Sequence, residues 1–407
     1  MLTRRFFLRG SAVVMAGSGA APAWLARAAS SESRKRKILV VIFQRGAADG
    51  LNIVIPFGEK RYRELRPNLG VAAPAGRPDN GAGPLAGGSI DLDGHFALHP
   101  AMRQLKPLWD KGQLAIVEAT GSADASRSHF DAQDYMESGT TSKTLGDGWL
   151  NRALPPESDA SPLRAVAVSK QLPLTLRGER DAIAIGDAQQ FNLGNQQATE
   201  ILENMYAASK DPRVGRTGKD AFEAMKLIAS VNKTPLGPQG FQFGELGSSL
   251  QQLARLIKAD AGVEAAFAEI GGWDHHGNEN QQLSTLLNQF SGALAGFAQE
   301  MGDRMEDIVL VTMSEFGRTA AENGDAGTDH GHGSVMMVLG GPVQGGKVYG
   351  KWPGLEKEQL FEGRDLAVTT DYRAVLSELV RGHMGQTDLS RVFPGFTPGD
   401  SLGLLKA

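Results

Sequence analysis

Histidines are the residues of this chain best suited to metal chemistry, and they gather in short polar stretches. The sequence has eight histidines and no cysteine, so a metal ion would have to be held by imidazole, carboxylate or hydroxyl groups. One stretch, Thr328 to Gly333, contains Asp329, His330 and His332 among glycines that let the backbone bring side chains together. It predicts a divalent metal site; the simpler alternative is a polar turn with two nearby histidines.

A second stretch, residues 271–276, places a carboxylate and two imidazoles after a strand-like run and two glycines. Asp274 and His276 are two residues apart, so on an extended backbone both side chains project to the same side. The pair therefore predicts a carboxylate and an imidazole that face the same way.

Residues 126–129 place hydroxyl groups at the start of a predicted helix. Ser126 or Ser128 can simply cap that helix. The same position would also hold a hydroxyl at the positive end of the helix dipole, beside Arg127 and His129. A phosphoryl or sulfuryl group, or an activated nucleophile, is well stabilised there. Both interpretations stay open, with Ser128 and Ser126 as rival nucleophiles.

Continuous apolar runs must position these side chains. Ile38 to Phe43 and Ile308 to Thr312 are runs of the kind buried in a parallel sheet. Asp49 follows the first run, although an ordinary turn would explain it equally well, and Glu315 and Arg318 follow the second. Strands alternate with amphipathic helices, which predicts an α/β fold with a mostly parallel sheet covered on both faces. Sites in such folds lie at the carboxyl ends of the strands.

Length and charge limit the possible functions. The chain has 407 residues, which is long enough for a large core, and its net charge of −4 provides no basic field to recruit nucleic acid. We expect a single domain over residues 36–407, interrupted by an irregular insertion around 67–94 that is rich in glycine and proline.

The amino terminus has the features of an export signal. Residues 1–28 begin with Arg4-Arg5 before Phe-Phe-Leu, continue through a mildly apolar run and end in small residues, which is typical of the twin-arginine route. The apolar run is too short for a stable membrane anchor. We therefore expect a periplasmic or secreted protein that meets the twin-arginine translocase during export.

Several motifs together resemble a known family of exported bacterial proteins. They are the twin-arginine start, residues 45–52, Ser128-His129-Phe130, Gly272-Trp273-Asp274-His275-His276, Ser314-Glu315-Phe316-Gly317-Arg318-Thr319 and Gly327-Thr328-Asp329-His330-Gly331. This set resembles the DUF1501 family over nearly the whole mature chain. That family is similar to the alkaline phosphatase-like superfamily, which includes sulfatases. The resemblance implies a three-layer sandwich with helices on both faces of a mostly parallel sheet.

The superfamily pattern suggests roles for individual residues. Asp49 resembles the acid that follows the first strand, although it lies several residues past the strand end. Ser128 resembles the nucleophile. Asp274, His276 and His330 look like the three ligands of one metal ion, although the Asp-to-His spacing is two rather than the usual four.

A second metal ion would need an Asp-His pair at a strand end. If the run Ile308 to Thr312 is the equivalent strand, that pair falls on Glu315 and Phe316, and a phenylalanine cannot bind metal. A competing alignment gives the Asp-His role to Asp329 and His330. The resemblance therefore implies one complete site for a divalent ion, with Zn, Mn and Fe not distinguished, and a second site that lacks a ligand.

The prediction is an exported, metal-dependent hydrolase of phosphate or sulfate esters, acting on a small-molecule or polymer-borne anionic ester. Ser128 Oγ would attack phosphorus or sulfur, with His129 beside it, while Arg127, Arg318 or Arg45 would hold the anionic oxygens.

In this prediction, the carboxylates of Asp49 and Glu315 bind a second ion or position the nucleophile. The alternative, favoured by Phe316, is a catalytically weakened periplasmic binding or accessory protein that keeps a metal for structure.

Overall fold

The computed structural model describes residues 36–76, 88–141, 145–156, 161–186, 196–231, 234–237 and 243–406. The expected export signal at 1–28 and part of the expected insertion, residues 77–87, lie outside these ranges. Within them, no helix combines the length and the apolar character needed to cross a membrane.

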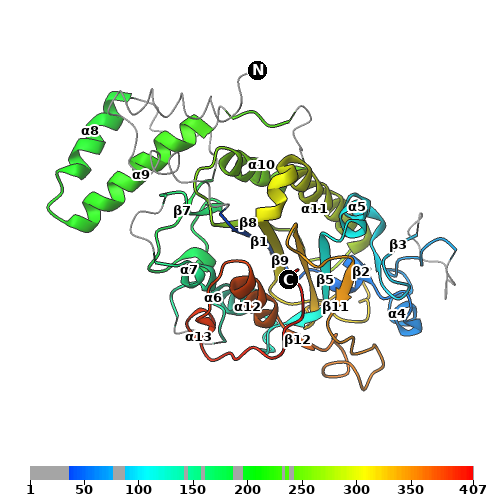
Figure 1. The fold of residues 1–407 in the computed structure, drawn as a ribbon. Helices are drawn as coiled ribbons and strands as arrows, with labels where there is room; N and C mark the ends of the chain where they lie inside the picture. Colours follow the sequence, from blue (N-terminus) through cyan, green and yellow to red (C-terminus); the bar gives the residue numbers. More distant parts are fainter. Residues whose placement is uncertain are drawn as a thin grey trace.

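A central sheet of nine strands organises the fold (Figure 1). In chain order the strands are β1 (Ile38–Gln44), β5 (Leu114–Gly121), β6 (Ala165–Val168), β7 (Ile183–Ala184), β8 (Ala265–Ile270), β9 (Ile308–Ser314), β10 (Ser334–Gly340), β11 (Lys347–Tyr349) and β12 (Thr370–Asp371). Their order across the sheet is β11-β5-β10-β9-β1-β8-β6-β7, and β12 pairs with β5. Strand β1 lies in the middle and is parallel to both neighbours.

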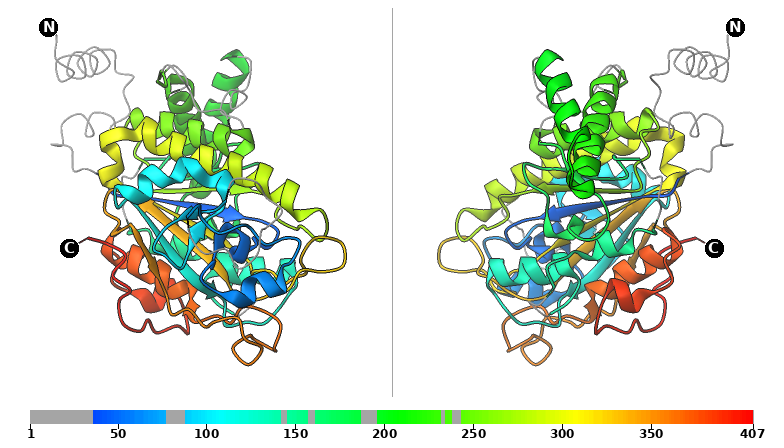
Figure 2. Two further views of the ribbon diagram at one scale, coloured as in Figure 1. Left: turned by 90° about the vertical axis from the view of Figure 1, so that its right-hand side faces the viewer. Right: turned by 90° about the vertical axis from the view of Figure 1, so that its left-hand side faces the viewer.

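Side chains alternate between two cores along β1, as a strand buried on both faces requires. Ile38, Val40 and Ile42 belong to one core, and Leu39, Val41 and Phe43 belong to the other. The first core is completed by η1 (Pro100–Leu105), α5 (Lys106–Asp110), α9 (Pro212–Val231), α10 (Gly244–Lys258) and α11 (Glu279–Met301). The second is completed by α6 (His129–Ser138), α7 (Trp149–Ala153), α12 (Tyr372–Gly382) and α13 (Leu389–Val392). The predicted mostly parallel sheet with helices on both faces is confirmed (Figure 2).

Smaller elements surround this sandwich. The short strands β2 (Val54–Ile55), β3 (Ile90–Asp91) and β4 (Ala97–Leu98) form a second sheet in the order β2-β4-β3. Residues near the end of the expected irregular insertion are therefore paired in a sheet. The remaining described elements are α3 (Gly50–Ile53), α4 (Lys60–Leu65), η2 (Leu174–Leu176), α8 (Gln196–Ala207) and η3 (Gly302–Asp307). Helices α8 and α9 pack on each other as a hairpin that projects from the sandwich (Figure 1).

One edge of the large sheet collects the loops that carry the polar motifs. Strands β1, β5, β8 and β9 run in the same direction, so the loops that follow them emerge at one edge. Among the described strands of this sheet, only β10 runs antiparallel to its neighbours. The loop before β10 therefore reaches the same edge as the loops after the parallel strands.

Candidate metal centre

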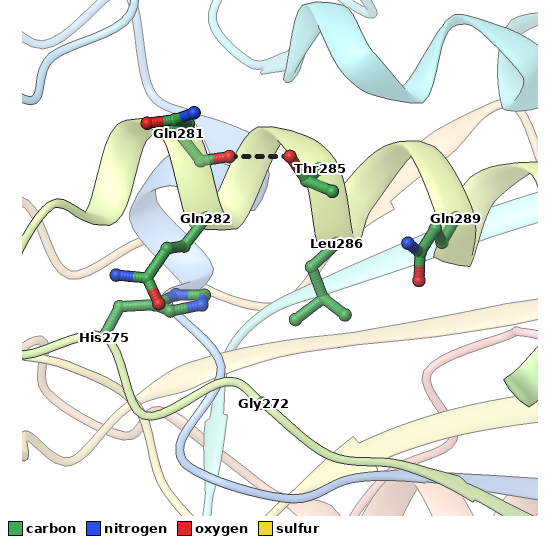
Figure 3. Close-up of a pocket in the computed structure, with 7 residues that line it drawn as sticks. All are labelled: Gly272, His275, Gln281, Gln282, Thr285, Leu286 and Gln289. Atoms are coloured by element: carbon green, nitrogen blue, oxygen red, sulfur yellow. Dashed lines mark hydrogen bonds between the residues drawn. The ribbon is translucent and has the colours of Figure 1, made fainter. Parts of the chain in front are cut away.

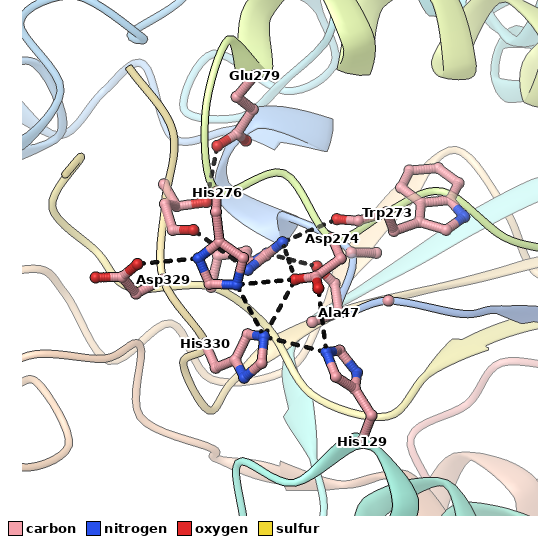
Figure 4. Close-up of polar contacts among 12 residues, drawn as sticks. Ala47, His129, Trp273, Asp274, His276, Glu279, Asp329 and His330 are labelled. Carbon is pink, nitrogen blue, oxygen red and sulfur yellow. Dashed lines mark hydrogen bonds and ion pairs between the residues drawn. The ribbon is translucent and has the colours of Figure 1, made fainter. Parts of the chain in front are cut away.

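Two loops and the start of a helix bring four potential metal ligands together at this edge (Figure 4). His129 is the first residue of α6, Asp274 and His276 lie in the loop after β8, and His330 lies in the loop before β10. Glycines allow the loops to pass closely. A Cβ atom on Gly46 would lie 2.7 Å from the backbone nitrogen of Asp274.

The ligand atoms of these residues converge on one another. His330 Nε2 lies 3.0 Å from His129 Nε2 and 3.1 Å from His276 Nε2. Asp274 Oδ1 lies 3.1 Å from the Nε2 atoms of both His276 and His330, and Asp274 Oδ2 lies 3.6 Å from His129 Nε2. The ligand atoms of His129, Asp274 and His330 all lie within 4.8 Å of one another, and His276 adjoins them through His330 and Asp274.

The second nitrogen of each imidazole fixes the tautomer. His129 Nδ1 lies 2.8 Å from Glu315 Oε1, and His276 Nδ1 lies 3.0 Å from Asp329 Oδ1. His330 Nδ1 lies 3.0 Å from the carbonyl oxygen of Arg127. All three partners are acceptors, so each neutral imidazole must carry its hydrogen on Nδ1, which leaves a lone pair on each Nε2.

Three lone pairs and a carboxylate therefore face each other without a hydrogen between them. Acceptors this close repel one another unless a cation lies among them. Ligands about 2.0–2.1 Å from a tetrahedral ion lie roughly 3.3 Å from each other, and the separations among His129, Asp274 and His330 are 3.0–3.6 Å. Imidazoles whose other nitrogen is bonded to a carboxylate or carbonyl are also typical of metal sites. The residues fit a divalent ion.

Charges around the cluster favour ionised carboxylates. Burial alone would raise the pKa of Asp274, but Arg318 and the neighbouring histidines hold it below its ordinary value. The hydrogen bond to Glu315 raises the pKa of His129, whereas burial lowers the pKa of His330. A proton on His129 Nε2 would therefore compete with a metal ion for this nitrogen.

Glu315 and Asp329, both predicted as ligands, are placed behind the imidazoles instead. Glu315 Oε1 also accepts hydrogen bonds from Gly46 N at 2.8 Å and from Gln133 Nε2 at 2.8 Å. Its carboxylate is thus committed to orienting His129 and the loop after β1. Among the described residues, a single group of three or more histidine or acidic side chains meets the geometry of an ion site, namely His129, Asp274 and His330, with His276 adjoining it.

Asp49, also predicted as a ligand, lies outside the cluster. Both of its oxygens accept from the Arg66 guanidinium, at 2.5 and 2.9 Å, and both side chains are buried. Arg66 holds the pKa of Asp49 below its ordinary value, although burial opposes this. Behind Asp49, burial and the Asp49 charge raise the pKa of Glu279 well above its usual range. The Asp49 carboxylate is therefore part of a buried ion pair.

Arg318, predicted to hold substrate oxygens, is buried and fully engaged within the protein. Its guanidinium donates to the carbonyl oxygens of Ala47, Thr328 and Trp273 and to Asp274 Oδ1 at 2.7 Å. We conclude that Arg318 ties three loops together and positions Asp274. Arg45, the other arginine considered, bonds Glu269, Gln133 and Glu137.

The predicted nucleophile lies beside the cluster in the chain. Ser128 is the N-cap residue of α6, and its side chain makes no capping hydrogen bond. Ser126 Oγ accepts from Ser128 N at 3.2 Å, so Ser126 supports the turn that precedes the helix. Phe316 packs against the rings of His129 and His330, with centroids 5.0 and 5.1 Å apart, and forms an apolar wall of the site.

Arg127 keeps a position at the rim of the site. Its backbone carbonyl accepts from His330 Nδ1, and its guanidinium donates to Asp365 and Glu362. Sequence reasoning found Arg127 but neither acidic partner, because both lie in a loop more than two hundred residues away in the chain.

A separate groove runs along α11 (Figure 3). Its volume is about 350 Å³, and its lining residues are Gly272, His275, Gln281, Gln282, Thr285, Leu286 and Gln289. Burial lowers the pKa of His275 to about 4, so this imidazole is neutral at physiological pH. The neighbouring side chains of Asp274 and His276 face the candidate metal centre, and His275 lines the groove.

Comparison with known proteins gives a family and distant structural likenesses. No curated protein matches the sequence. Among solved structures, the chain is similar to the lipoteichoic acid synthase LtaP from Listeria monocytogenes, with 11% identity, a TM-score of 0.34 and coverage of 76% of this chain and 68% of that one. It is also similar to alkaline phosphatase from the Antarctic bacterium TAB5, with 11% identity, a TM-score of 0.30 and coverage of 76% and 92%. The family described as "Protein of unknown function (DUF1501)" matches residues 36–395, and the chain therefore belongs to the DUF1501 family.

Proposed function

We propose that this protein is a metal-dependent hydrolase of phosphate or sulfate esters. The observation that carries the proposal is the convergence of three imidazole lone pairs and the Asp274 carboxylate at the helix end that bears Ser128. Four acceptors in such an arrangement call for a cation, and a hydroxyl at the amino end of a helix suits attack on an anionic ester.

The donor set narrows the identity of the cation. His129, His276, His330 and Asp274 would supply three nitrogens and one oxygen. Such a set suits Zn, Mn or Fe, whereas Mg and Ca prefer oxygen ligands. A divalent ion held there would polarise the ester and stabilise charge on the transferring group.

The residues of the chain would divide the remaining work. In the proposed step, Ser128 Oγ forms a bond to phosphorus or sulfur while the bond to the ester oxygen breaks and the alcohol leaves with a proton. Water then hydrolyses the serine ester and releases phosphate or sulfate. Phe316 excludes water from one side of the imidazoles, and Arg318 keeps Asp274 in place.

The experiment combines metal analysis with turnover. Metal content of the purified protein is measured by mass spectrometry, and hydrolysis of p-nitrophenyl phosphate and p-nitrophenyl sulfate is then assayed. Ser128→Ala is expected to abolish turnover but to retain the metal, and Ser126→Ala is expected to retain both. Unchanged turnover in Ser128→Ala would dismiss this serine as the nucleophile.

A second candidate function is a metal-containing accessory protein without catalytic activity. Phe316 favours it, because an apolar ring lies beside the imidazoles where a second ion would need a ligand. Bound metal without hydrolysis of either ester would support this alternative.

We also propose export by the twin-arginine route and a periplasmic or secreted location, on the basis of Arg4-Arg5 and the apolar run that follows. Arg4→Lys with Arg5→Lys should leave the protein in the cytoplasmic fraction. Normal export of this variant would contradict the proposed route.

A further inference from the structure

A tight turn at residues 361–364 carries a carboxylate to the rim of the candidate metal centre. Arg364 N donates to the carbonyl oxygen of Phe361 at 3.1 Å. Both central residues have positive φ, +54° at Glu362 and +65° at Gly363, as in a type I′ turn. Asparagine, aspartate and glycine suit these positions, and a longer side chain such as glutamate does not. Glutamate is therefore an unfavourable residue at position 362 of this turn.

Glu362 uses this position to reach Arg127. Its Oε2 accepts from Arg127 Nη2 at 2.6 Å, and 56% of the glutamate side chain is exposed. The hydrogen bond lowers the pKa of Glu362, so the group is a carboxylate at neutral pH. An ion pair this exposed contributes little stability and does not offset a strained backbone. Stability alone therefore does not explain a glutamate here.

Arg127 keeps its orientation independently of Glu362. Asp365, whose side chain is fully buried, accepts from Arg127 Nε at 3.1 Å and from Arg127 Nη2 at 2.6 Å. Arg364 Nε also donates to Asp365, at 2.8 Å. The two arginines and two acids balance to zero charge, so loss of Glu362 would leave one positive charge at the rim with its geometry intact.

That rim adjoins the proposed ligands directly. The carbonyl oxygen of Arg127 accepts from His330 Nδ1, and Arg127 is two residues before His129. Arg364 Nη2 donates to the carbonyl oxygen of His330. Because Arg127 and Arg364 share Asp365, the Arg127 guanidinium also lies close to the backbone of His330.

We propose that Arg127 is an anion-binding residue of this site and that Glu362 is an internal carboxylate that occupies Arg127 and is displaced by an oxyanion of the ligand. The inference rests on the proposed function for the identity of the ligand as an anionic ester. Glu362 then sets the affinity and the selectivity for anions, because only a ligand with sufficient negative charge displaces it.

The test measures binding of inorganic phosphate by calorimetry to protein whose metal content is known. Glu362→Gln removes the competing charge, and Glu362→Asn also relieves the turn, so the second variant should fold at least as well as the wild type. The matched control is Glu179→Gln, which removes one charge from another exposed ion pair, that with Arg391. Arg127→Gln is combined with Glu362→Gln to complete a double-mutant cycle.

Both Glu362 variants should bind phosphate about two- to fivefold more tightly, the range expected for releasing an exposed ion pair. Glu179→Gln should show no such gain in phosphate affinity. Glu362→Gln should also give no gain when the double variant is compared with Arg127→Gln alone. Equal affinities for Glu362→Gln and Glu179→Gln, persistence of the gain without Arg127, or absence of phosphate binding in every variant would each overturn the proposal.

Calorimetry separates this proposal from the proposed hydrolase function. Tighter phosphate binding by the Glu362 variants without ester turnover would support the anion site and contradict the hydrolase. Ester turnover with equal phosphate affinities for Glu362→Gln and Glu179→Gln would do the reverse.

Discussion

Two clusters of ionisable groups lie at the same edge of the sheet. They differ in whether their hydrogen-bond acceptors face donors or other acceptors. In the buried cluster, Arg66 donates to both oxygens of Asp49. The raised pKa of Glu279 favours its protonated form, which can donate a hydrogen bond to Asp49. In the exposed cluster, the Nε2 atoms of His129, His276 and His330 meet only other acceptors. A dense group of charges is therefore structural where donors meet acceptors, and points to an ion where acceptors meet acceptors.

Removal of a ligand should have the largest effect. His330→Ala is expected to lower metal affinity by more than the roughly 10–100-fold that loss of a supporting residue costs, because its Nε2 lies within 3.1 Å of a ligand atom of each of the other three residues. Metal content after dialysis, compared between His330→Ala and the wild type, measures this loss of affinity. His332→Ala is the control, since that ring stacks on Phe361 rather than facing the cluster, and equal metal loss in both variants would contradict the assignment.

Breaking the buried pair should affect stability instead of metal binding. Asp49→Asn leaves Arg66 without a counter-charge, which is expected to cost about 3–5 kcal/mol of unfolding free energy. Urea denaturation measures the change. The same substitution at Asp260, which pairs with Arg304 on the surface, should change stability by less than about 1 kcal/mol. A loss at Asp49 as small as that at Asp260 would mean that the pair is not structural.

The supporting carboxylates should have an intermediate effect on the metal. Asp329→Ala removes the acceptor of His276 Nδ1 and is expected to weaken metal binding about 10–100-fold, measured by competition with a chelator. Asp329→Asn keeps an acceptor oxygen at this position and should lose less. A larger loss for asparagine than for alanine would show that Asp329 acts in another way.

The smallest expected effect is a change in pH dependence. The raised pKa of Glu279 means that the folded protein holds a proton which the unfolded chain releases above its ordinary pKa of about 4.5. Stability should therefore fall as pH rises from that value through the raised folded-state pKa. Glu279→Gln should flatten this fall, as denaturation at several pH values would reveal; an unchanged slope would place the proton elsewhere.

Sequence patterns predicted the parts of the molecule that depend on local periodicity. Continuous apolar runs identified β1 and β9, and the two-residue spacing of Asp274 and His276 predicted side chains on one side of the loop. His276 Nε2 and Asp274 Oδ1 face the same cluster. These predictions need only the neighbouring residues of the chain.

Contacts between distant segments were beyond sequence reasoning. The sequence shows His129 only as a neighbour of the predicted nucleophile, because no spacing rule links it to residues 274 and 330. Asp49 resembles the acid that follows the first strand in the superfamily, which suggests a role at a second ion or beside the nucleophile. Nothing in the sequence shows that Arg66, seventeen residues on, donates to both of its oxygens. Carboxylates that bind a metal and carboxylates that orient a ligand, such as Glu315, look alike until their hydrogen bonds are known.

The reversed direction of β10 has a consequence for assembly. His330 lies shortly before β10, which pairs with both β9 and β5, and β10 follows the segments that carry His129, Asp274 and His276 in the chain. A bound ion would then link residues 129, 274, 276 and 330, closing loops that span half of the polypeptide and removing much of the freedom of the unfolded chain. A bound ion would thus stabilise the folded chain, and slow release of the ion would slow its unfolding.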